Sequence, residues 1–533
     1  MERRGFLAAS AATVASLALP SVGGAASRQV LKFIPNADLA VLDPVWSTVY
    51  VTRNHGYLVF DTLYGQTGPA SGSKPTPQMV AGHDVGDDGR TWRLTLRDGL
   101  MFHDGESVLA KDCVGSIRRW GGRDALGQTL MQRTDELSAP DDRTIVFRLK
   151  RPFPLLPEAL GKTGPNMCAM MPSRLAATDP FKPVMEMVGS GPFRFKLDER
   201  VPGARYVYER FQEYRPRDDG GGGPEWTSGP KVAHFDRIEW LVIPDPATAA
   251  AALQSGEVDG WERPTGDLLP LLSQDPKLKL ELIYETGGCM LMRPNHLFPP
   301  FDKAAVRRAL LPVIDQNEAM IAVIGTDPSL RKVPTGFFPP GSPMASNAGM
   351  KVLDGPRDYD LAKRELKAAG YDGAPVALMV PQDYPILKAA SEISAEMMKR
   401  AGMVVDYQAV DWGTAVQRRA SKKPASQGGW NAFCTNFSAD ELSSPATHLA
   451  LRGNGGQAWP GWPTSSRLEE LRDRWLDATD LTTQKQIAVE IQVQAFEDVP
   501  YFPLGTFYNP SAYRAGLTGI LHGFPIFWNV RRA

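Results

Sequence analysis

Residues 92–105 read "WRLTLRDGLMFHDG" and combine the pattern of a short, half-buried strand with two turn signals. Apolar side chains occupy every second position of the first half: Trp92, Leu94 and Leu96. This alternation predicts a short strand with one buried face. Asp98-Gly99 and Asp104-Gly105 are typical of turns, and residues 107–120 then show the apolar spacing of a helix. No catalytic residue is evident in the pattern.

Length and composition set the broad class of the chain. It has 533 residues, 43% of them apolar, which is enough for two or three domains with buried cores. Its 59 Lys and Arg residues balance 60 Asp and Glu residues, so the net charge of −1 indicates no general affinity for nucleic acid or acidic membranes. The 45 prolines and 50 glycines predict many turns and long surface loops.

The N-terminus has the features of an export signal. Two arginines precede an Ala/Ser/Leu/Val stretch, and small residues at 24–26 fit signal-peptidase cleavage after Ala26. Arg3-Arg4 resembles a twin-arginine signal, but Glu2 stands where Ser or Thr is usual, so twin-arginine and ordinary export both stay open. No cysteine lies near the cleavage site, and no later stretch has 18 uninterrupted apolar residues. We expect residues 1–26 to be removed and the mature protein to be soluble in the periplasm, without a lipid anchor.

The predicted elements change in character near residue 285. Before it short strands dominate, with a flexible loop predicted over 218–230, where four consecutive glycines occur. Beyond it helices alternate with apolar strands, a pattern typical of an α/β lobe. The sequence thus predicts two α/β lobes, the first carrying inserted β-rich material. The main elements expected are strands at 30–33, 144–149, 206–211, 376–380 and 404–410, and helices at 53–64, 246–255, 303–314, 361–369, 386–401, 468–478 and 483–496.

The sequence offers no recognisable catalytic apparatus. Its seven histidines include no pair at i, i+4 and none beside a cysteine or acidic cluster at the spacing of metal ligands. His103 has no evident partner for general-base work, and Gly189-Ser190-Gly191 is too compact for a nucleophile elbow. A Walker loop and a GxGxxG motif after a strand are missing too. We therefore expect no catalysis, no cofactor and no bound metal.

Cysteines and aromatic residues give weaker signals. The four cysteines are widely spaced and form no CxxC motif, which favours buried free thiols, although a disulfide is possible in an exported protein. Six aromatic residues gather within about fifty positions of the second lobe, several of them in Gly/Pro/Ser-rich segments. They either form part of the core or line a ligand pocket. The second alternative is open because large side chains on loops often line pockets. They are Trp412, Trp430, Phe433, Phe437, Trp459 and Trp462.

Residues 84–119, "DVGDDGRTWRLTLRDGLMFHDGESVLAKDCVGSIRR", resemble the signature of the extracellular solute-binding proteins of the oligopeptide/dipeptide-binding class (family 5), the receptors of ABC importers. One departure is Cys113, where Val is usual. Five further blocks agree in order along the mature chain. They are Leu42-Asp43-Pro44 with Asp61-Thr62-Leu63, "GSGPF" (189–193), "LQSGEVD" (253–259), "PFD" (300–302) with "VRRAL" (306–310), and "YDLAKRELKAAGY" (359–371).

The resemblance implies an α/β, type II periplasmic-binding-protein fold, with two lobes joined by a two-strand hinge and an extra β-rich domain inserted in the first lobe. The quoted stretch then belongs to that extra domain as scaffold. The crossings are expected near Glu285–Met292 and Tyr501–Tyr508. The expected division is 27–72, 190–287 and 505–533 for lobe 1, 73–189 for the extra domain, and 288–504 for lobe 2.

The resemblance also points to ligand residues. In peptide-binding members, the segment equivalent to "FCTNF" (433–437) carries an Asp whose carboxylate captures the peptide's N-terminal ammonium. Here Asn436 stands in that place, with Asp440 as a nearby rival. An amide turns a charge-assisted hydrogen bond into a neutral one, weaker by about 1 kcal/mol, so the ligand need not carry a free α-ammonium. The residues expected in the cleft are Tyr50 from lobe 1 and Trp412, Trp430, Phe433, Cys434 and Asn436 from lobe 2.

The function implied by the resemblance is that of a monomeric periplasmic receptor. It captures a peptide, a peptide-like compound or another small solute by lobe closure and delivers it to the permease subunits of an ABC importer. Two alternatives stay open because fold alone does not settle function. One is a periplasmic peptide or amide hydrolase, and the other is a solute-binding sensor or chaperone without a role in transport. The identity of the solute does not follow from the sequence.

Overall fold

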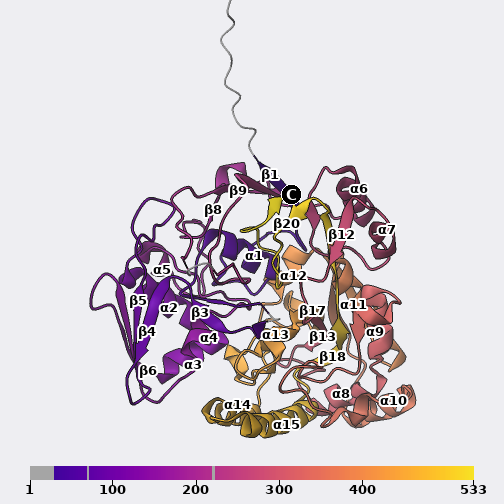
Figure 1. Cartoon of the computed structure of the whole chain (residues 1–533). Helices are drawn as coiled ribbons and strands as arrows, with labels where there is room; N and C mark the ends of the chain where they lie inside the picture. Colours follow the sequence, from indigo (N-terminus) through magenta and orange to yellow (C-terminus); the bar gives the residue numbers. More distant parts are fainter. Residues whose placement is uncertain (1–28, 69–70, 219–221) are drawn as a thin grey trace, which may run out of the picture.

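The computed structural model describes residues 29–68, 71–218 and 222–533. Three larger sheets of seven, six and four strands organise the chain, and helices cover them (Figure 1). We call the part built on the seven-stranded sheet lobe 1, the part built on the six-stranded sheet lobe 2, and the part built on the four-stranded sheet the extra domain. The predicted signal peptide, residues 1–26, lies outside the described residues.

The quoted stretch begins with β5 (Thr91–Leu96) in the four-stranded sheet of the extra domain. All three of its alternating apolar side chains are buried, as the pattern predicts. Gly99 and Gly105 have φ angles of +73° and +91°, which glycine adopts far more readily than other residues, so both predicted turns form. The sheet order is β4-β5-β7-β6, with β4 at Val80–Val85, β6 at Thr134–Ser138 and β7 at Thr144–Leu149.

Helix α2 (Ala110–Arg123) begins three residues later than the sequence predicts. Ser107, the first residue of the predicted helix, instead forms a β-bridge with Met101 across the turn at Asp104-Gly105. The nearby His103 is buried, and its Nε2 lies 2.9 Å from the carbonyl oxygen of Gly191. Burial lowers the pKa of His103 to about 4, so the ring is neutral and ties the extra domain to lobe 1.

Lobe 1 is built on the sheet β12-β19-β11-β1-β10-β9-β8. Strand β1 lies in its interior and pairs in parallel with both β10 and β11. Helix α1 (Tyr50–Val59) is buried along its whole length, and it ends five residues before the predicted end because the chain enters β2 at Tyr64. The strands are β1 (Val30–Ile34), β8 (Phe193–Phe195), β9 (Arg205–Arg210), β10 (Arg237–Leu241), β11 (Gly260–Trp261), β12 (Leu278–Glu281) and β19 (Ser511–Arg514).

Lobe 2 is built on the sheet β14-β18-β13-β17-β15-β16. Its central strand β13 is buried along its length between β17 and β18, both antiparallel to it. The strands are β13 (Gly288–Pro294), β14 (Arg331–Lys332), β15 (Val376–Pro381), β16 (Val405–Val410), β17 (Ala432–Ser438) and β18 (Phe502–Phe507).

The other helices and small strands complete the three parts. The predicted helix at 303–314 is split, because α8 ends at Ala309 and a 3₁₀ turn with a proline, Leu311–Val313, follows. The remaining helices are α3 (Ala125–Arg133), α4 (Leu156–Leu160), α5 (Ser173–Ala176), α6 (Pro246–Ser255), α7 (Leu269–Ser273), α8 (Ala304–Ala309), α9 (Gln316–Ile324), α10 (Tyr359–Ala368), α11 (Pro385–Arg400), α12 (Trp412–Arg418), α13 (Ala439–Leu442), α14 (Ser466–Asp477) and α15 (Leu481–Asp498). Two strand pairs are β2 (Tyr64–Gln66) with β3 (Pro75–Pro77) and β20 (Leu517–Thr518) with β21 (Arg531–Arg532).

The chain passes between the two lobes twice. Residues 282–287 lead from β12 in lobe 1 to β13 in lobe 2, and residues 508–510 lead back from β18 to β19. Strand β18 therefore runs across the expected boundary at 504/505. The two passages leave neighbouring strands of the lobe 2 sheet, and bending at them remains a prediction.

Three further findings concern the cysteines, membrane-spanning helices and metal sites. In the part of the chain that the structure describes, the four cysteines are free and buried, as the sequence favours. No helix among these residues is long and apolar enough to cross a membrane. Within the same ranges no group of three or more His, Cys, Asp or Glu residues is placed to hold a metal ion.

Candidate functional site

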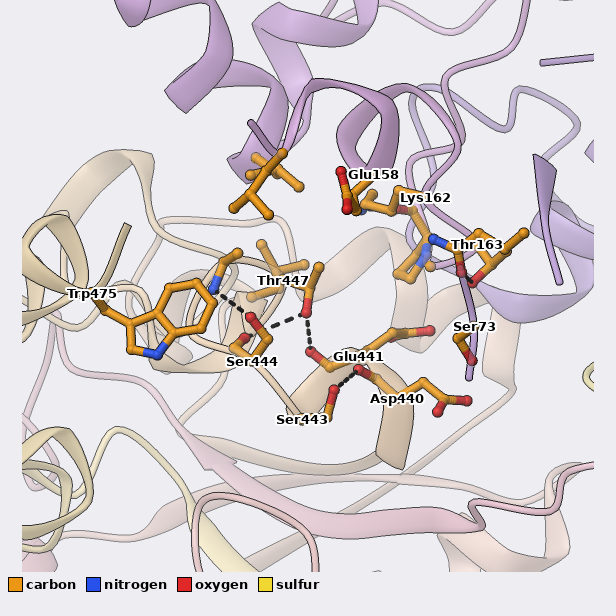
Figure 2. A pocket seen from close by; sticks show the side chains of 17 residues that line it. Ser73, Glu158, Lys162, Thr163, Asp440, Glu441, Ser443, Ser444, Thr447 and Trp475 are labelled. Atoms are coloured by element: carbon orange, nitrogen blue, oxygen red, sulfur yellow. Dashed lines mark hydrogen bonds between the residues drawn. The ribbon is translucent and has the colours of Figure 1, made fainter. Parts of the chain in front are cut away.

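The lobes and the extra domain meet around α13, near the centre of the view in Figure 1. A cavity of about 210 Å³ lies there, and Figure 2 shows residues of the extra domain on one side of it and residues of lobe 2 on the other. Two smaller cavities, of about 10 Å³ each, adjoin the same region on the lobe 1 side. Side chains from three parts of the fold thus line this group of cavities.

Tyr50 links the two lobes directly. It is the first residue of α1 in lobe 1, and its hydroxyl donates a hydrogen bond to Glu441 Oε2 at 3.0 Å in lobe 2. The same hydroxyl accepts a hydrogen bond from the backbone N–H of Ser438 at 2.6 Å. Tyr50 is buried, and burial raises its pKa well above the usual value, so it stays a neutral donor. The structure therefore places this predicted site residue at the contact between the lobes.

Arg53 lies about one turn after Tyr50 on α1 and faces the same carboxylate. Its Nη1 is 3.6 Å from Glu441 Oε1, and the side chains of Arg53 and Glu441 are only 3% and 8% exposed. The guanidinium also lies over the ring of Tyr50, 4.5 Å from the centroid. Burial raises the pKa of Glu441 to about 7, against the lowering effect of Arg53 and Lys162. The carboxyl group of Glu441 therefore titrates near neutral pH.

Asp440, the neighbour of Glu441, lines both the large cavity and one of the smaller ones. Its Oδ2 accepts a hydrogen bond at 2.8 Å from the hydroxyl of Thr286, which lies in the passage between the lobes. Burial raises the pKa of Asp440, with Thr286 and Arg53 acting in the opposite direction. The structure thus brings Asp440 to the cavity as a partly satisfied carboxylate.

A second inter-lobe contact involves Arg263 of lobe 1. Its Nη1 donates a hydrogen bond at 3.1 Å to the hydroxyl of Tyr384, the residue before α11 in lobe 2. The buried neighbour Glu262 accepts a hydrogen bond at 2.7 Å from the hydroxyl of Tyr284, and the Arg263 guanidinium lies 5.1 Å from the Tyr284 ring centroid. Two arginines of lobe 1, the buried Arg53 and the half-buried Arg263, thus reach the boundary with lobe 2.

Trp412 begins α12 and lies close to this second contact. Its ring meets that of Tyr384 edge-on, with centroids 5.3 Å apart, and its backbone N–H donates to Asp383 Oδ1 at 2.7 Å. Its Nε1 is buried without a hydrogen-bond partner. Trp412 thus packs behind the inter-lobe contact, outside the three cavities around α13.

The predicted aromatic residues of β17 and its approach pack against one another. Trp430 is fully buried, donates from Nε1 to the carbonyl oxygen of Arg419 at 3.1 Å, and lies 4.8 Å from the ring of Phe433. Phe433 in turn lies 5.6 Å from Trp459. These contacts correspond to the core alternative that the sequence left open. A ligand role for Trp430 and Phe433 remains a prediction.

Cys434 and Asn436 project from the other face of β17, because side chains alternate along a strand. The Sγ of Cys434 lies 3.4 Å from the hydroxyl of Ser394 on α11, which shows that this face turns toward that helix. Asn436 is 6% exposed, and its Nδ2 has no hydrogen-bond partner. Neither residue lines the three cavities around α13. Their contact with a ligand remains a prediction.

Sequence reasoning did not single out Arg53, Arg263, Glu158 or Glu441. Arg53 left a visible signal, since it is the one charged residue of the otherwise uncharged stretch "YVTRNHGYLVF" (50–60). A buried charge needs a partner, so such a position is a candidate for function. The partner, Glu441, lies 388 positions away and cannot be found from local pattern.

Comparison with known proteins identifies the family. The model of the bacterial extracellular solute-binding proteins, family 5, matches residues 74–458. A probable peptide ABC transporter periplasmic-binding protein of Sinorhizobium fredii, y4tO, is 37% identical over 100% of this chain and 98% of its own length. The glutathione-binding protein GsiB of Pectobacterium atrosepticum is 26% identical, covering 83% of this chain and 82% of its own.

Solved structures share the fold. The periplasmic binding protein AgaA of A. tumefaciens R10, in complex with agropinic acid, has a TM-score of 0.78 at 20% identity, covering 95% of this chain and 99% of its own. DppA of Helicobacter pylori, in complex with the peptide STSA, has a TM-score of 0.77 at 20% identity, covering 95% of this chain and 98% of its own. The type II periplasmic-binding-protein fold expected from the sequence is therefore confirmed. With a family model covering most of its length, the chain belongs to family 5 of the bacterial extracellular solute-binding proteins.

Proposed function

We propose that this protein captures a peptide or a peptide-like solute between its lobes and presents it to the permease subunits of an ABC importer. The family, and the relative y4tO described as a probable peptide ABC transporter component, support a role in transport. A glutathione-binding relative and a structural neighbour holding a tetrapeptide support a ligand of peptide character. The protein then works in the periplasm, as a monomer and without catalysis.

The observation that carries this proposal is the cavity of about 210 Å³ between the extra domain and lobe 2, with buried ionisable groups of opposite sign beside it. A ligand held there contacts two parts of the protein that the chain connects only through lobe 1 and the two passages. It stabilises the closed arrangement by the difference between its affinities for the closed and the open form. Permease subunits that recognise the closed form then receive only the loaded protein.

The charges suggest how a peptide lies in the site. Lobe 1 contributes the guanidinium of Arg53, and lobe 2 contributes the carboxylates of Asp440 and Glu441. Asp440 has one oxygen bonded to Thr286, which leaves acceptor capacity for a ligand ammonium. We infer that Asp440, rather than Asn436, binds the α-ammonium, because Asp440 lines the cavity and Asn436 does not.

Two measurements test the proposal. Native mass spectrometry of the protein purified from the periplasm is expected to show a co-purified small molecule. Small-angle scattering with a panel of di- to pentapeptides is expected to show a more compact particle for the peptides that bind in calorimetry. A profile unchanged by every peptide, or a peptide recovered in cleaved form, contradicts the proposal.

A further inference from the structure

The cavity lies between the extra domain and lobe 2, which are in direct contact with each other beside it. Helix α3 of the extra domain meets α14 of lobe 2, where Arg133 Nη2 lies 2.9 Å from Asp477 Oδ1 and Arg472 Nη2 donates to Thr129 Oγ1 at 3.1 Å. Its volume of about 210 Å³ is below the roughly 300–1,000 Å³ of pockets that enclose a whole drug-sized ligand. The space therefore fits one part of a ligand, such as a single side chain.

A carboxylate with no partner in another residue lies on the extra-domain side. Glu158 of α4 is half-buried and lines the cavity near Lys162 in Figure 2. Among the residues that the structure describes, its buried Oε2 has no hydrogen-bond partner, and the carboxylate is bonded only by its own backbone N–H. Burial raises its pKa. The Oε2 atom therefore lacks a cation or donor from another residue.

The opposite side of the cavity supplies two more carboxylates, Asp440 and Glu441. Glu441 is 7% exposed, and its Oε1 has no hydrogen-bond donor, since the nearest guanidinium nitrogen, of Arg53, is 3.6 Å away. Gly164 of the extra domain approaches the Glu441 side chain so closely that a Cβ there would lie 3.1 Å from its Cγ. Incompletely satisfied acidic groups thus face the same space from both sides.

The nearby cations do not balance these carboxylates. Lys162 lines the cavity, but its Nζ lies 2.5 Å from Asp124 Oδ2 and donates to the carbonyl oxygen of Pro165 at 2.7 Å, so its charge is already compensated. Arg53 forms its ion pair with Glu441 and also lowers the pKa of Asp440. The cavity therefore has more acidic groups than cations to pair with them.

The walls between the acidic groups suit an aliphatic chain. Apolar side chains come from both parts of the fold, and Trp475 adds an aromatic ring, which attracts a nearby cation. Ser444 and Thr447 add hydroxyl groups on the lobe 2 side, as Figure 2 shows. The apolar lining residues are Leu126, Leu155, Pro165, Ala446 and Leu449.

From this geometry we propose that the cavity is a specificity pocket for a basic side chain, an amine or guanidinium on an aliphatic stem, with Glu158 as its anionic end. The inference rests on the proposed function, because it assigns one part of the peptide ligand to this space. It predicts a preference for peptides that contain lysine, ornithine or arginine.

Calorimetry with matched peptides tests the pocket. Three tripeptides carry lysine at the first, second or third position with alanine elsewhere, and three partners carry norleucine, which has an uncharged chain of similar length. In the wild-type protein, at least one lysine peptide is expected to bind tenfold or more tightly than its norleucine partner. Glu158→Gln is expected to reduce this ratio below threefold, while binding of the norleucine peptide changes by less than threefold.

Glu106→Gln is the matched control, because Glu106 lies exposed in the same extra domain and outside the cavity. Glu158→Ser provides a second uncharged variant, and thermal melting verifies that each variant is folded. If the peptides bind without a lysine preference, or if the preference survives both Glu158 variants, the pocket is refuted while the proposed function stands. If none of the six peptides binds the wild-type protein, the pocket is refuted, and the proposed function is then decided by the panel of di- to pentapeptides described above.

Discussion

Replacing Tyr50 by Phe removes a single hydroxyl from the contact between the lobes. That hydroxyl donates to Glu441 Oε2 at 3.0 Å and accepts from the N–H of Ser438 at 2.6 Å. A hydrogen bond to a charged group contributes about 1.5–3 kcal/mol and a neutral one about 0.5–1.5 kcal/mol. Both groups regain water when the lobes separate, so the loss falls on the closed form.

Taking the lower limits, the closed form loses about 2 kcal/mol relative to the open form, which shifts their ratio about 30-fold. The expected result for Tyr50→Phe is a larger radius of gyration without ligand in small-angle scattering. Apparent affinity for a bound peptide is expected to fall, up to the same factor, because less of the protein is closed.

Tyr57→Phe is the matched control. Tyr57 lies on the same helix α1 and is fully buried, but its hydroxyl donates to the carbonyl oxygen of Lys162, at 3.1 Å, and not to lobe 2. This variant is expected to be less stable toward urea by about 1 kcal/mol, with an unchanged radius of gyration. Equal effects of the two variants on scattering and on peptide affinity would show that the Tyr50 hydroxyl has no special role between the lobes.

Three further predictions concern charge. Burial in the closed state raises the pKa of Glu441 to about 7, so protonated Glu441 favours that state. The contribution of Glu441 to closed-state stability is full below the ordinary carboxyl pKa and is lost as pH rises through about 7. Scattering between pH 4.5 and 8 should show this change in the wild-type protein and not in Glu441→Gln. N-acetylation of a bound peptide is expected to weaken calorimetric binding tenfold or more, and Asp440→Asn to remove that difference; equal binding of acetylated and free peptides by the wild-type protein would instead favour Asn436 and a ligand without a free ammonium. Lys231→Met leaves the fully buried Asp61, which lies 2.7 Å from Nζ of Lys231, without its cation. The free energy of unfolding in urea is expected to fall by about 3–5 kcal/mol. An unchanged urea midpoint would mean that the pair is dispensable.

The fold could be predicted in some detail because its signals are local. The alternation in β5 and the glycines at 99 and 105 act within a few residues of one another, and the structure bears them out. Element ends were less certain, since tertiary contacts set them: the bridge of Ser107 to Met101 delays α2. Six ordered blocks were then enough to indicate the arrangement of the lobes.

The site could be predicted only in part because its residues meet through the tertiary fold. Tyr50 is predicted to reach the cleft from lobe 1; the structure places it at the contact between the lobes, where its partner Glu441 lies 391 positions away, and its contact with a ligand remains a prediction. Aromatic residues such as Trp430 look alike in sequence whether they line a pocket or fill a core, and this one is fully buried. A charged residue without local partners, such as Arg53, is a better guide than an aromatic residue to the positions at the boundary between the lobes.

The strand order of lobe 1 has a consequence for biosynthesis. Strand β19 (Ser511–Arg514) lies between β12 and β11, so a segment from the last 23 residues of the chain fills the interior of a sheet whose first strand is made at residue 30. Until residues 511–514 have been made, β11 and β12 have an open gap between them and expose unpaired backbone groups. The sheet of lobe 1 therefore cannot be completed during synthesis before all the strands of lobe 2 have been made.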